Sequence, residues 1–120
     1  MFVRLKSMEE LSVINTMYEV YKKLIQINIA IDKKYRHAMS EPAIISCLET
    51  LQYLIKAKHA PKMIKSSHLI DAAAAAELVA LQVRAILELK LENETNLLKV
   101  QARLTEARKQ ITGWRKSLPA

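Results

Sequence analysis

The stretch that decides the fold is residues 93–118, NETNLLKVQARLTEARKQITGWRKSL. Apolar residues recur along it at alternating spacings of three and four, which places them on one narrow strip of an α-helix. We call this strip the seam, and it comprises Leu97, Val100, Leu104, Ala107, Ile111, Trp114 and Leu118. The remainder of the helix carries six basic residues against Glu94 and Glu106, namely Lys99, Arg103, Arg108, Lys109, Arg115 and Lys116. The sequence therefore predicts a helix that packs through its seam and presents a basic outer surface.

Two residues near the end of this helix have alternative interpretations. Trp114 lies on the seam, which favours core packing over stacking on a nucleic-acid base. Gly113 inside a helix costs about 1 kcal/mol relative to Ala, and either close packing or a fraying helix end would explain it.

Composition favours one all-helical domain spanning residues 1–120. About half of the residues are hydrophobic, and only one Gly and three Pro interrupt them. Long helices with few tight turns are typical of such a chain. We expect helices at about residues 8–31, 41–59, 67–91 and 94–118. The short connections predict an up-down-up-down antiparallel four-helix bundle.

The first predicted helix begins at Ser7, which has capping-box spacing to Glu10. It carries two apolar stripes side by side. One is Leu11, Ile14, Tyr18, Tyr21 and Ile25, and the other is Val13, Met17, Val20, Leu24, Ile27 and Ile31. A second stripe indicates either contact with another subunit or a deeply buried central helix.

Ser40 is the expected N-cap of the second helix, with Pro42 in its first turn. Its predicted core face comprises Ile44, Leu48, Leu51 and Ile55. Cys47 lies beside this face, which favours a small buried hydrophobe over a reactive thiol.

Pro61 ends the second helix, and residues 62–67 form an expected basic linker. The third helix is apolar nearly all round, so burial on more than one side is expected. Its main line is Leu69, Ala73, Ala76, Ala80, Val83 and Leu87. The five alanines at 72–76 permit close helix approach, although helix propensity alone also accounts for them.

The chain has a formal charge of +7, which favours polyanionic partners. An antiparallel bundle brings the N-terminus, the second connection and the C-terminus to one end, making that end basic. The candidate nucleic-acid-binding residues there are Lys62, Lys65, Arg103, Arg108, Lys109, Arg115 and Lys116. At the other end the candidates are Lys33, Lys34 and Arg36, diluted by acidic neighbours.

No motif for catalysis is recognisable. The three histidines lack zinc-ligand spacing, and the single glycine cannot form a phosphate-cradling loop. We therefore expect no catalytic residue, no cofactor and no metal. Without a signal-peptide pattern or an apolar run of about 18 residues, we expect a cytoplasmic protein with no membrane partner.

Three stretches resemble one protein family. Residues 106–117 resemble the closing Glu-x-x-x-x-Leu-Gly-x-Trp signature of bacterial four-helix-bundle proteins, which include the accessory variability determinant of diversity-generating retroelements. Met17–Tyr21 resembles the first helix of that family, and Val83–Leu89 resembles its Leu-Arg-x-x-Leu-Arg-Leu stretch, with Glu88 where the family often has Arg. The resemblance covers about residues 15–118.

This resemblance implies a homopentameric barrel of bundles that binds template RNA and cDNA and a partner reverse transcriptase. The accessory protein supports error-prone copying of the template and is not itself an enzyme. Two alternatives stay open. The family also includes proteins encoded in intervening sequences of bacterial 23S ribosomal RNA genes, and the chain could instead be a pure protein-interaction bundle.

Overall fold

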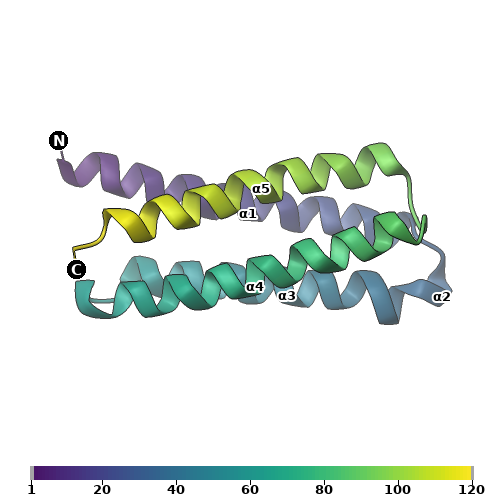
Figure 1. Cartoon of the computed structure of the whole chain (residues 1–120), viewed down its shortest axis with the longest axis horizontal. Coiled ribbons are helices and arrows are strands. Elements are labelled where there is room, and N and C mark those ends of the chain that lie inside the picture. Colours follow the sequence, from purple (N-terminus) through teal and green to yellow (C-terminus); the bar gives the residue numbers. More distant parts are fainter. Residues whose placement is uncertain (1, 120) are drawn as a thin grey trace.

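Four long helices form the molecule in a computed structural model, which describes residues 2–119 and the side chains of Glu10 and residues 12–119. They are α1 (Phe2–Ala30), α3 (Glu41–His59), α4 (Lys62–Glu88) and α5 (Glu94–Ser117). Two short elements, α2 (Lys33–Tyr35) and the π-helical turn η1 (Arg36–Ser40), join α1 to α3. The long helices lie side by side with alternating directions in a rod of 47 × 22 × 19 Å (Figure 1). The predicted all-helical bundle is confirmed.

The helices occupy the corners of a square. Helix α1 packs against α3 and α5, and α4 packs against the same two helices. The pairs α1/α4 and α3/α5 therefore lie on the diagonals. Both chain ends and the α3–α4 turn lie at the left end in Figure 1, and α2 and the α4–α5 loop lie at the right. This is the arrangement of connections that the antiparallel topology predicts.

The seam of α5 is in the core. Its first six residues, Leu97, Val100, Leu104, Ala107, Ile111 and Trp114, are buried, and Leu118 is partly buried. Asn93 caps the helix, since its side-chain oxygen accepts a hydrogen bond from the backbone N–H of Asn96 at 3.2 Å. The pattern of three and four thus predicted the buried face of this helix correctly.

Helix α1 buries one of its two stripes. The stripe from Val13 to Ile31 is buried, whereas Tyr18 of the other stripe is 50% exposed. The Leu11 side chain lies outside the described residues. The polar side of α1 meets α5, where Gln110 donates to Ser12 Oγ at 3.1 Å. The second apolar stripe lies beside α3 instead, so α1 is not a fully buried central helix within one chain.

The predicted core face of α3 is wrong. The buried residues are Ala43, Ser46, Cys47, Thr50, Leu54 and Ala57, whereas Leu48 and Ile55 of the predicted face are exposed. Ile44 and Leu51 are only partly buried. Most of the buried side chains are small, which allows a close approach to the neighbouring helices and leaves Leu48 and Ile55 outside the interior.

Helix α4 is rotated slightly from the predicted line. It buries Leu69, Ala72, Ala76, Val79, Val83 and Ile86, while Ala73, Ala80 and Leu87 lie at the edge of the core. Two of the five alanines are therefore fully buried. The α3–α4 pair is the most closely packed in the bundle, which supports the close-approach interpretation of the alanines.

Several predicted helix ends are also wrong. Helix α1 begins at Phe2 rather than near residue 8, so Ser7 lies within it, and its side chain is outside the described residues. Helix α4 begins at Lys62 directly after Pro61, so the expected linker at 62–67 is helical. That helix ends at Glu88, three residues before its predicted end, whereas α3 spans the range expected for it.

Ser40 is not an N-cap. Its backbone is helical because η1 continues directly into α3, and it makes no side-chain cap. Its buried hydroxyl donates instead to Asn28 Oδ1 at 2.5 Å, which ties η1 to α1. This bond and the Cys47 thiol, which donates to the Met17 carbonyl oxygen at 3.8 Å, fix the antiparallel register of α1 and α3.

Candidate nucleic-acid interface

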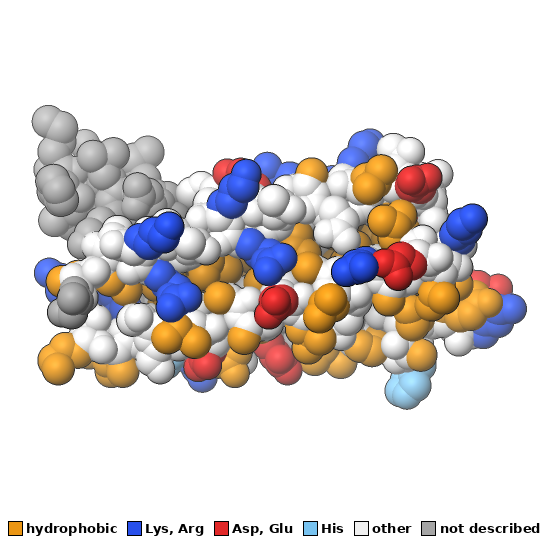
Figure 2. All heavy atoms as spheres, in the orientation of Figure 1, with side chains coloured by type: hydrophobic (Ala, Val, Ile, Leu, Met, Phe, Trp, Pro, Cys, Tyr) orange, Lys and Arg blue, Asp and Glu red, His pale blue; other side chains and the backbone are white. Residues whose placement is uncertain are grey.

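The basic side of α5 is exposed over the last three turns of the helix. Arg108, Lys109, Arg115 and Lys116 form two pairs of adjacent residues seven positions apart, which is about 10.5 Å at 1.5 Å per residue. All four are exposed because the seam directs the opposite side of the helix into the core. We call these four residues the α5 basic face. Figure 2 shows Lys and Arg side chains gathered over this part of the bundle.

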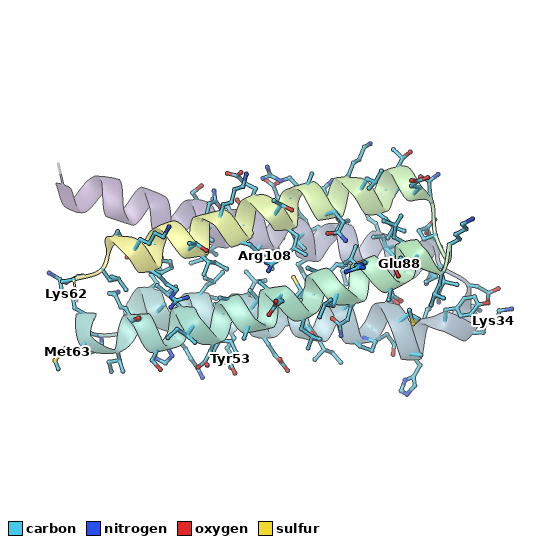
Figure 3. All side chains as sticks on the ribbon, viewed as in Figure 1. Lys34, Tyr53, Lys62, Met63, Glu88 and Arg108 are labelled. Atoms are coloured by element: carbon cyan, nitrogen blue, oxygen red, sulfur yellow. The ribbon has the colours of Figure 1, made fainter. Side chains whose placement is uncertain are left out.

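An open hollow of about 450 Å³ lies on this face. Its lining has three cations and no carboxylate, and consists of Thr105, Arg108, Lys109, Thr112, Gly113 and Lys116. A second hollow, between α4 and α5, adjoins it at Arg108 and contains Glu77. Arg108 projects from α5 on the side of α4 (Figure 3). Glu77 therefore lies at the α4 edge of the basic face, and Glu106, three residues before Lys109 on α5, is a second exposed carboxylate outside the lining of the hollow.

Gly113 is exposed at the edge of this face that lies towards α1, where it also borders a hollow lined by Ser12. It lies inside α5, and among the described residues no atom outside its own helix backbone and its two chain neighbours would lie within 4 Å of a Cβ at this position. Close packing does not account for this glycine among the described residues, and Gly113 lies four residues before the end of α5 at Ser117. A shared helical face for Lys109, Gly113 and Lys116 follows from their spacings of four and three, which is the signal that could have located the hollow.

Trp114 points inward. It is 6% exposed and belongs to the core, as its position on the seam predicts. The four described tyrosines lie on α1, α2 and α3. Among the described side chains, the α5 basic face thus presents charge without an aromatic surface on which bases could stack.

Three of the predicted binding residues have partners within the chain. Lys65 donates to the carbonyl oxygens of Ala57 (2.7 Å) and Lys58 (3.0 Å), so it caps the C-terminal end of α3. Arg36 donates to the carbonyl oxygen of Ile29 at 2.9 Å.

Arg103 lies 2.5 Å from Glu19 of α1 in a half-exposed ion pair. A carboxylate this close neutralises most of its attraction for an external anion. Arg103 therefore offers less charge to a ligand than the residues of the α5 basic face. Lys65 and Arg36 keep their charge, but part of their donor capacity is used by backbone carbonyl groups within the bundle.

The other predicted residues divide between the two ends of the rod. Lys62 lies at the α3–α4 turn and Lys34 lies on α2 at the opposite end (Figure 3). Lys33 is on the same short helix as Lys34, whose Nζ is 5.1 Å from the centre of the Tyr35 ring. Since the rod is 47 Å long, the ten candidates do not form one surface. Only Lys62 joins the end where the α5 basic face lies.

Cys47 has the environment of an unreactive thiol. It is fully buried, and burial raises its pKa from 9.0 to about 12. Desolvation disfavours the thiolate, which is the nucleophilic form. The interpretation of Cys47 as a buried hydrophobe is confirmed.

Metal-ligating side chains do not gather in groups of three or more in the part of the chain that the structure describes. Among the described helices, none combines the length and apolar character needed to cross a bilayer. Comparison with known proteins gives no match to a family model, a curated protein or a solved structure.

Proposed function

We propose that this protein is a non-catalytic nucleic-acid-binding scaffold that supports a partner reverse transcriptase in copying template RNA, as the accessory protein of a diversity-generating retroelement does. The observation that carries the nucleic-acid part is the α5 basic face, with four exposed cations on one rigid helix. The resemblance of residues 106–117 and of the two shorter stretches supports the retroelement assignment. Cations on a helix contact backbone phosphates without reading base sequence.

Salt dependence tests this proposal directly. Each phosphate contact that is made releases condensed counterions, so the affinity for RNA should fall steeply between low and moderate salt. Removing four contacts is expected to weaken binding at low salt by about a hundredfold or more and to flatten the salt slope by about three. The variant replaces each residue of the α5 basic face by Ala, and fluorescence anisotropy with a labelled RNA measures both quantities.

A matched pair of double variants controls for total charge. Lys109→Ala with Lys116→Ala removes two cations from the α5 basic face, and Lys33→Ala with Lys34→Ala removes two from the other end. The first pair should weaken binding by at least ten times more than the second, since only the first lies on the proposed interface. Equal losses, or an affinity that does not change with salt, would contradict the proposal.

The proposed scaffold is a homo-oligomer, a pentamer by the family resemblance. Support comes from an apolar surface along α1 and α3, which we call the α1/α3 apolar face. Its exposed members are Tyr18, Ile29, Ile45, Leu48 and Ile55. They lie on two helices that pack against each other. A contiguous exposed apolar surface is typical of a protein–protein interface.

Light scattering after size-exclusion chromatography tests the assembly. At micromolar concentration the mass should be five times the 13.7 kDa of one chain. A Tyr18→Glu, Leu48→Glu variant should give monomers, because it places charges in the apolar contact. Both residues are about half exposed, so the bundle itself should stay folded, which circular dichroism can verify. A monomeric unmodified protein would contradict the oligomer proposal.

The same apolar face favours a second candidate, a bundle that only binds other proteins. In that case the unmodified chain should purify without nucleic acid and should not bind RNA at low salt. The remaining alternative, a protein of a ribosomal RNA intervening sequence, is distinguished by the neighbouring gene. A reverse-transcriptase gene beside this one supports the retroelement role.

A further inference from the structure

We infer that the hollow beside Gly113 is a binding site for a single phosphate group. The inference rests on the proposed nucleic-acid function for its natural ligand, which would be one phosphate of an RNA or cDNA backbone. The same chemistry would accept a phosphate from a small molecule, and the experiment below separates these sources.

The glycine provides the space. Lys109 lies one turn before Gly113 and Lys116 lies almost one turn after it, so the two ammonium groups flank a position that has no side chain. No described atom would contact a Cβ there within 4 Å. A phosphate can therefore approach the helix surface between two flexible cations, which is a close approach that any larger residue would obstruct.

The hydrogen-bond donors around this space suit the oxygen atoms of a phosphate group. Arg108 supplies a guanidinium fork and the lysines supply ammonium donors, all from the lining of one hollow. Within the described part of the chain the Thr105 hydroxyl has no hydrogen-bond partner, so it can donate to a ligand. The Thr112 hydroxyl already donates to the Arg108 carbonyl oxygen at 3.1 Å. Three cations and one free hydroxyl thus line the hollow, and none of the described residues that line it is a carboxylate.

The helix dipole acts against this site, because the C-terminal end of α5 is its negative end. That effect is confined to the last turn and is weaker than the attraction of three nearby side-chain charges. The Ser117 hydroxyl also donates to the Trp114 carbonyl oxygen at 2.7 Å, which satisfies one of the terminal carbonyl groups. The net field at Gly113 therefore favours an anion.

A Gly113→Leu variant tests the phosphate site without changing any charge. Leu is a strong helix former and has open space at this position, so the bundle should fold normally. Its affinity for labelled RNA at low salt should fall by about tenfold, the effect of losing one charge-assisted contact. Ala102→Leu is the matched control, since Ala102 is exposed on the same side of α5, outside the hollow, and that variant should bind like the unmodified protein.

A titration with inorganic phosphate tests the phosphate site in the absence of RNA. In the unmodified protein, titration with phosphate should shift the amide signals of Gly113 and its neighbours saturably, and should leave that of Ala102 unchanged. Gly113→Leu should abolish these shifts. Two results together would overturn the phosphate site: Gly113→Leu binds RNA as the unmodified protein does, and phosphate shifts no signal in the unmodified protein. The proposed function would then still stand. Saturable phosphate-induced shifts without any RNA binding would support a site for a small phosphate ligand and contradict the nucleic-acid function.

Discussion

Replacing Trp114 with Ala is expected to lower the free energy of unfolding by about 3–5 kcal/mol. Trp114 is the largest residue of the seam and is 6% exposed, so the substitution removes a large apolar contact and leaves a cavity at the end of the bundle. Neighbouring helices that are already close-packed cannot move far enough to fill such a cavity. Loss on this scale is a large fraction of the stability of a domain of this size.

Urea unfolding followed by circular dichroism measures this loss, because the substitution also removes the only tryptophan of the chain. Lys109→Ala serves as the control, since it truncates an exposed residue on the same helix and should change stability by less than about 0.5 kcal/mol. A loss below about 1 kcal/mol for Trp114→Ala would show that this residue contributes little to the core.

Cys47 is expected to react with alkylating reagents about a thousandfold more slowly in the folded protein than in the unfolded chain at pH 8. Burial raises its pKa from 9.0 to about 12, so the thiolate fraction at this pH falls by about three orders of magnitude. The rate of iodoacetamide labelling, with and without denaturant, measures the difference. Rapid labelling under native conditions would contradict the buried thiol.

The same shift makes the contribution of Cys47 to stability depend on pH. Above pH 9 the unfolded chain loses the thiol proton while the folded chain keeps it, so the folded state binds more protons and stability falls as pH rises. The fall from this group is at most about 1.4 kcal/mol per pH unit, between pH 9 and 12. Below pH 9 both states keep the proton and the effect disappears.

Lysines and tyrosines also titrate in this range, so the comparison requires a Cys47→Ala variant measured over the same pH values. The difference in unfolding free energy between the two proteins isolates the thiol. It should be constant below pH 9 and should shift in favour of the variant above it. A difference that stays constant up to pH 11 would contradict the raised pKa.

The proposed assembly and the proposed interface use different sides of the bundle. Helix α3, which carries three of the five residues of the α1/α3 apolar face, lies diagonally across from α5. Subunits that meet through that face would leave the α5 basic face exposed on each copy. Several phosphate-binding surfaces in one particle would raise the avidity for a long RNA beyond that of one chain.

The sequence by itself determined the buried side of α5, because its apolar residues form a single narrow strip and its charges occupy the rest. It could not determine the buried side of α3, where bulky apolar residues such as Leu48 and Ile55 compete with small ones. There the choice depends on how closely the neighbouring helices approach, which is a property of the assembled bundle.

The same division applies to the candidate interface. The sequence located the four residues of the α5 basic face, since their exposure follows from the helical period. It could not show that Lys65, Arg36 and Arg103 have partners of their own, because each partner lies on a different helix or beyond a turn. Nor could it show that Gly113 lines an open hollow with Lys109 and Lys116, because the space beside a residue depends on where the neighbouring helices lie. Periodicity fixes which side of a helix faces inward, and only the tertiary structure decides which charges are left for a ligand.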